Sequence, residues 1–207
     1  MERFKNRDIK KYLIALLIFL AAGSAYAGTI ATFADPTSDG STPLFTINLN
    51  TDKISAGWAD SQTGLTLNVL GTTYNDAYFT MTDVTYTGGI TGGTTGGGTI
   101  SLFADGGAVP LVQIAFTSAH VSPYGFGGAD GSLFFADGIT ITGSAIAGTL
   151  SDESFSFNFA NQQALGGNIA NGFTATSGFS LSAVPEPTSV LLLGISGLFI
   201  RRRRRSN

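Results

Sequence analysis

Apolar and polar residues alternate in several short runs of this chain, and this period of two constrains the fold more than any other feature. The clearest runs are residues 45–49, 65–69 and 155–159, where every second side chain is Phe, Ile, Leu or Val. Successive side chains of a β-strand point to opposite faces, so such a run places one face against a core and the other in water. The pattern predicts strands that are buried on one side.

Strand-like segments fill the middle of the chain. Further candidates are residues 77–86, 99–103, 111–116, 132–135, 139–147 and 173–184. No segment between them sustains an apolar stripe at helical spacing, and the glycine-rich residues 91–98 are interpreted as a flexible hairpin tip. Short strands joined by Gly and Asp turns predict an all-β body, an antiparallel β-sandwich or jelly-roll-like fold over residues 28–183.

A weak repeat lies inside this body. Residues 101–106 and 132–138 both begin Ser-Leu-Phe and end Ala-Asp-Gly. Asp-Gly between two strand-like runs favours a tight hairpin, because both central residues of that turn need positive φ. We expect two similar hairpins, although convergent turn chemistry explains the likeness equally well.

The first 27 residues have the organisation of a secretory signal peptide. Five basic residues precede an apolar run at residues 12–22, and Ala25, Tyr26 and Ala27 then form an A-x-A site before Gly28. These three regions in this order are what signal peptidase substrates carry. We therefore predict a signal-peptide helix in residues 1–27, export through the Sec machinery and cleavage between Ala27 and Gly28.

The last 24 residues form a second targeting segment with three parts. Residues 188–200 carry no charge, and as a helix they span about 20 Å, against about 30 Å for a bilayer's hydrocarbon core. The motif before them is Val184, Pro185, Glu186 and Pro187. The cluster after them is Arg201, Arg202, Arg203, Arg204 and Arg205. Arginines stay on the cytoplasmic side, so we predict a short transmembrane helix that tethers the protein to the inner membrane, with the motif facing outward.

This tail resembles the PEP-CTERM sorting signal. The resemblance implies recognition by an exosortase, a membrane cysteine protease-transpeptidase, with cleavage at Pro185-Glu186-Pro187. It also implies only transient contact with the inner membrane, and delivery to the cell surface or to an extracellular matrix that contains exopolysaccharide. The chain then divides into a signal peptide (1–27), a β-sandwich body (28–183) and a sorting signal (184–207). A retained C-terminal anchor is the alternative.

The charge of the body differs from that of the whole chain. The full sequence has a formal charge of −3, but residues 28–187 contain one basic residue, Lys53, and 12 acidic ones, which gives −11. A surface of this kind repels nucleic acid and anionic lipid, so nucleic acid is not expected as a partner. It would suit a divalent cation, and Asp35 and Asp39 are weak candidate calcium ligands, although their spacing is not that of an EF-hand loop. No other cofactor is expected.

Residues suited to catalysis are scarce. The chain has no cysteine, and its one histidine is His120. The body has no G-x-S-x-G elbow to present a nucleophilic serine. We therefore expect a protein that is not an enzyme.

Several aromatic residues are candidates for binding sugar rings. They are Trp58, Tyr74, Tyr78, Tyr86 and Tyr124. The first expectation is a non-catalytic structural or adhesive role outside the cell. The alternatives are a carbohydrate- or calcium-binding, lectin-like module, and an ice-binding protein.

Overall fold

This computed structural model describes residues 27–36, 44–58, 64–130 and 136–185, and antiparallel strands make up most of these residues. The strands are β1 (Gly28–Phe33), β2 (Phe45–Asn48), β3 (Lys53–Trp58), β4 (Leu65–Val69), β5 (Thr72–Met81), β6 (Val84–Gly89), β7 (Gly92–Thr95), β8 (Gly98–Phe103), β9 (Val112–Phe116), β10 (Ala119–Ser122), β11 (Gly125–Ala129), β12 (Thr140–Thr142), β13 (Leu150–Ala164) and β14 (Gly172–Pro185). Two short 3-10 helices, η1 (Leu165–Gly167) and η2 (Ile169–Asn171), connect the last two strands. The strands belong to one compact unit, Ala27–Val184.

The alternating runs of the sequence form strands with one buried face. In β13, Phe155 and Phe157 are buried, whereas Ser156 and Asn158 are exposed. The same alternation holds in β2 and β4. The prediction of an antiparallel all-β body is confirmed.

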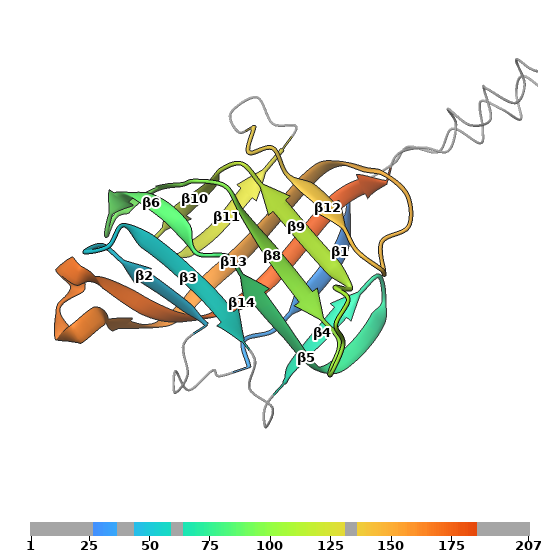
Figure 1. The fold of residues 1–207 in the computed structure, drawn as a ribbon, viewed down its shortest axis with the longest axis horizontal. Helices are drawn as coiled ribbons and strands as arrows, with labels where there is room; N and C mark the ends of the chain where they lie inside the picture. Colours follow the sequence, from blue (N-terminus) through green and yellow to red (C-terminus); the bar gives the residue numbers. More distant parts are fainter. Residues whose placement is uncertain (1–26, 37–43, 59–63, 131–135, 186–207) are drawn as a thin grey trace, which may run out of the picture. The chain divides into compact units, whose positions relative to one another are not determined.

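The strands form one connected network rather than two separate sheets. Their order is β12-β9-β8-β5-β4-β1-β14-β13-β11-β10-β7-β6-β3-β2, with further pairings of β5 with β3 and of β14 with β2. The long strands change partners along their length: β14 pairs first with β2 and then with β1, and β5 pairs first with β4 and then with β8. In Figure 1, β8 and β9 pass in front of β13 and β14, so the network folds into two facing layers.

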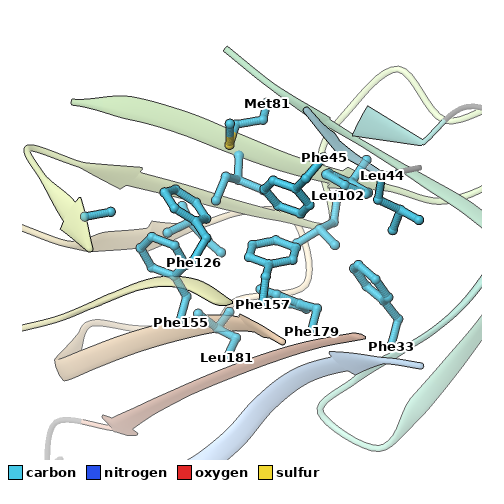
Figure 2. Close-up of a cluster of buried hydrophobic side chains, with 14 of the residues drawn as sticks. Phe33, Leu44, Phe45, Met81, Leu102, Phe126, Phe155, Phe157, Phe179 and Leu181 are labelled. Carbon is cyan, nitrogen blue, oxygen red and sulfur yellow. The ribbon is translucent and has the colours of Figure 1, made fainter. Parts of the chain in front are cut away.

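Phenylalanine rings fill the space between these layers. The ring of Phe157 lies 4.9 Å from that of Phe45, 5.9 Å from Phe79 and 4.7 Å from Phe179, measured between centroids. Figure 2 shows Phe157 among the other labelled side chains of this cluster. Burying each such ring contributes about 1.5–3 kcal/mol, so a chain without cysteine holds its layers together by packing.

Some strand predictions were wrong in detail. Residues 77–86 are divided between β5 and β6, and only three of residues 139–147 form a strand, β12. Residues 91–98 are not a loop, because they contain β7; the turn lies at Gly89–Gly92 instead. The predicted strand at 132–135 lies outside the described residues.

The second predicted Asp-Gly hairpin has its first strand, residues 132–135, outside the described residues. β12, the strand after Asp137-Gly138, pairs with β9, whereas β11 pairs with β10 and β13. Gly138 does take positive φ, at 57°. Asp137 does not take positive φ, so the expectation of positive φ at both central residues was wrong at this Asp-Gly pair.

Both predicted targeting helices lie outside the described residues. Within the described part of the chain, no helix has the length and apolar character that a membrane crossing requires.

Candidate functional site

The first candidate site is the point where the chain enters and leaves the body. Ala27 directly precedes β1, and β14 ends at Pro185. β1 and β14 are antiparallel neighbours, and Gly28 is the register partner of Ala183. Figure 1 shows the end of β14 beside β1. The predicted first residue of the mature chain therefore lies next to the first residues of the predicted sorting motif.

The backbone pairing of β14 with β1 extends as far as Ala183. Beyond that residue, the carbonyl oxygen of Val184 accepts a hydrogen bond from Ser151 Oγ at 3.4 Å. Pro185 is exposed, and it has no N–H group with which to continue a ladder. β14 therefore includes the first two residues of the sorting motif and ends at Pro185.

The remaining predicted processing residues lie outside the described ranges. They are Ala25, Glu186, Pro187, Arg201, Arg202, Arg203, Arg204 and Arg205. Their roles stay predictions.

The predicted calcium ligands are only partly described by the structure. Asp39 lies outside the described residues. Asp35 accepts a hydrogen bond from Thr176 Oγ1 on β14, so it links the end of β1 to that strand. Among the residues that the structure describes, no three His, Cys, Asp or Glu side chains come together as metal ligands.

A second candidate site surrounds Asp137, which sequence reasoning treated only as a turn residue. Its side chain is buried, with 3% of the residue exposed. Oδ1 accepts a hydrogen bond from Ser118 Oγ at 2.6 Å and lies 3.5 Å from His120 Nε2, and Oδ2 accepts the amide N–H of Ala129 at 3.0 Å. A buried carboxylate needs such donors, because each unsatisfied oxygen is costly.

This cluster does not have the order of a nucleophilic triad. In such a triad the histidine lies between the serine and the acid. Here the carboxylate of Asp137 lies between Ser118 and His120. The cluster fixes the strands around it, and the prediction that the protein is not an enzyme remains a prediction.

Beside this cluster, the outer surface of β10, β11 and β13 is hollowed by a cavity of about 320 Å³. We call this cavity the glycine groove. Its lining residues are His120, Val121, Ser122, Tyr124, Gly125, Phe126, Gly127, Ser156, Phe157 and Asn158. Binding pockets for small molecules begin at about 300 Å³, so the groove is at the small end of that range.

The floor of the groove is a glycine strand. Gly125 and Gly127 of β11 lie between β10 on one side and β13 on the other. A Cβ atom at Gly127 would lie 2.4 Å from the carbonyl oxygen of Phe155, and one at Gly125 would lie equally close to that of Phe157. Only glycine fits this approach, and the missing side chains leave the hollow.

The fold places the candidate sugar-binding aromatic residues in different environments. Trp58 and Tyr86 belong to the core, so they were wrong as residues that line a surface site. Tyr74 packs against the core. Tyr78 stacks on Phe103 at 4.7 Å. Tyr124 is 82% exposed, at the end of the glycine groove.

Sequence reasoning missed most of the groove. The signals were the G-x-G pattern at Gly125 and Gly127, and the polar row of β13, where Ser156 and Asn158 alternate with the buried rings. Each signal is visible in the sequence, but the pairing of the strands that joins them is not.

Comparison with known proteins identifies the tail. Residues 183–205 match the model of the PEP-CTERM protein-sorting motif. The match begins at the end of β14 and extends through the last arginine, so it confirms the resemblance found in the sequence. No curated protein and no solved structure matches the chain.

Proposed function

We propose that this protein is a non-catalytic structural or adhesive component of the cell surface or of an exopolysaccharide-containing matrix, delivered there by an exosortase. The PEP-CTERM motif at residues 183–205 carries the proposal, because this motif implies export and processing at the membrane. Before processing, the tail tethers the protein to the inner membrane. The exosortase and the signal peptidase are its processing partners.

The position of the motif supports processing of a folded body. Backbone pairing of β14 with β1 extends through Ala183, and Pro185 ends the strand. Cleavage at Pro185-Glu186-Pro187 therefore removes no residue that pairs with β1. The body keeps its strands after it is released.

The two predicted targeting segments join the body at neighbouring residues. Gly28 and Ala183 are paired, so the chain enters and leaves the body at neighbouring residues. Both targeting segments are therefore joined to the same end of the β1–β14 pair. Removal of both segments frees this end.

Replacement of the acidic residue of the motif tests the proposal. We expect Glu186→Gln to accumulate as a membrane-bound precursor, while the wild-type protein is found outside the inner membrane. Glu153→Gln is the matched control, because it removes the same charge from the body. Fractionation of cells followed by immunoblotting measures both variants. Normal release of Glu186→Gln, or equal retention of Glu153→Gln, would contradict the proposal.

A further inference from the structure

We propose that the glycine groove binds a neutral polysaccharide, with Tyr124 as the stacking residue and the side chains of β10 and β13 as hydrogen-bond partners. This inference rests on the proposed matrix role for the source of its ligand and names the class of that ligand.

The pairing of the strands gives the groove two polar walls. Ser122, Gly125 and Asn158 lie opposite one another on β10, β11 and β13. His120, Gly127 and Ser156 form the next such row. Neighbouring strands are about 4.8 Å apart, so the walls stand about 10 Å from each other across the glycine floor. A single sugar chain can lie between walls at this separation.

The backbone around Tyr124 is fixed, although its ring is exposed. The carbonyl oxygen of Tyr124 accepts the amide N–H of Phe159 at 2.8 Å, and its own N–H donates to Ser122 Oγ at 3.2 Å. The Gln162 side chain also donates to the carbonyl oxygen of Pro123. A ring that is 82% exposed on a fixed turn loses little conformational freedom when it covers a ligand.

The chemistry of the walls matches sugar hydroxyl groups. The side chains of serine, asparagine and histidine each offer donors and acceptors, and Ser122, Ser156 and Asn158 bring them to both sides of the floor. The tyrosine ring supplies an apolar face for the C–H face of a pyranose, and its hydroxyl supplies a polar edge. The groove therefore combines an aromatic surface with a few convergent polar groups, as ligand sites do.

The charge of the body favours a neutral ligand. Lys53 is the one basic residue among residues 28–187, which carry a formal charge of −11, and it lies on β3, outside the groove. A polyanionic chain would be repelled by this field and would find no lysine or arginine in the groove. Neutral hexose polymers carry no such penalty.

Affinity electrophoresis of the protein purified from culture tests the proposal. Native gels containing a soluble glucan, mannan or galactan are compared with gels containing alginate, a polyanion. We expect at least one neutral polymer to retard the protein and alginate to leave its mobility unchanged. Tyr124→Ala should weaken the retardation about tenfold, because it removes the aromatic contact with the ligand, and Asn158→Ala should weaken it several-fold.

Val109→Ala is the matched control, because Val109 is 66% exposed and lies outside the groove. It should bind as the wild-type protein does, and thermal melting checks that each variant is folded. Absence of retardation by all three neutral polymers, retardation by alginate, or unchanged binding of Tyr124→Ala would overturn the proposal. Lost binding with normal removal of the tail rejects the groove alone. Intact binding with a retained tail rejects the sorting proposal alone.

Discussion

Asp137 is a turn residue that also joins separate parts of the sheet. Its carboxylate accepts hydrogen bonds from Ser118, just before β10, and from Ala129, at the end of β11. Its carbonyl oxygen accepts the N–H and the hydroxyl of Thr117. A single buried side chain thereby holds the β10–β11 hairpin against the segment that leads to β12.

Removal of this carboxylate should destabilise the fold strongly. We expect Asp137→Ala to lower the free energy of unfolding by about 3 kcal/mol, because it leaves buried donors without acceptors. The matched control is Asp105→Ala, which changes the exposed aspartate of the other Asp-Gly pair and should cost less than about 0.5 kcal/mol. Urea denaturation measures both variants. Equal losses would show that Asp137 has no special structural role.

Tyr86 should make stability depend on alkaline pH. Burial raises the pKa of Tyr86, because desolvation disfavours the phenolate. The raised pKa stabilises the folded state below about pH 10, the pKa in the unfolded chain, and this contribution is lost as pH rises through the folded-state pKa. Above about pH 10, the free energy of unfolding of Tyr86→Phe should therefore decline less steeply than that of the wild-type protein.

The matched control for this measurement is Tyr124→Phe, at an exposed position. Urea denaturation from pH 8 to 11 compares the two variants. Tyr86→Phe also loses the hydrogen bond to the carbonyl oxygen of Gly89, which costs about 1 kcal/mol at every pH. The prediction therefore concerns the slope of the free energy of unfolding against pH, and the constant loss from the missing hydrogen bond does not affect that slope. The same slope in Tyr86→Phe and the wild-type protein would contradict the account.

At the scale of elements, strands were predictable where side chains alternate and not where glycine replaces them. β2, β4 and β13 were predicted because their apolar side chains, on the buried face, alternate with polar side chains on the other face. β7 (GGTT) and β11 (GFGGA) offer few side chains to show a period. These two strands form by pairing with other strands, and some of those partners are distant in the sequence. A local sequence pattern therefore does not predict them.

The same distinction applies to the two candidate sites. The sorting motif is a continuous stretch, so the sequence alone was enough to find it. The glycine groove combines residues of three strands, and Ser156 lies across from His120 only through the register of β11. Residue types could suggest Tyr124 as a sugar contact, but its neighbours depend on the fold.

Gly172 tests whether backbone approach determines the pairing of β2 with β14. Gly172 has φ of 111°, and a Cβ atom there would lie 1.9 Å from the carbonyl oxygen of Ile47. We expect Gly172→Ala to cost at least about 2 kcal/mol through strain and a displaced strand.

Gly89→Ala is the control for this substitution, because a Cβ atom at Gly89 meets nothing within 4 Å. It should change the free energy of unfolding by less than about 0.5 kcal/mol. Thermal and urea denaturation measure both variants. A loss in Gly89→Ala as large as that in Gly172→Ala would show that steric approach is not the cause.

At the scale of the whole molecule, a predicted signal peptide and a PEP-CTERM sorting motif flank an acidic β body in which Gly28 pairs with Ala183. The basic residues of the chain, apart from Lys53, lie in residues 1–11 and 201–205. Removal of both segments would change the formal charge from −3 toward −11 and free the end formed by Gly28 and Ala183. Processing would thus convert a tethered precursor into an acidic extracellular protein without altering its sheet.

Intact-mass spectrometry of the protein recovered from outside the cell tests this account most directly. The mass should correspond to a chain that begins at Gly28 and ends within or next to Pro185-Glu186-Pro187, without Arg201 to Arg205. A mature extracellular species that still carries the arginine cluster would contradict it.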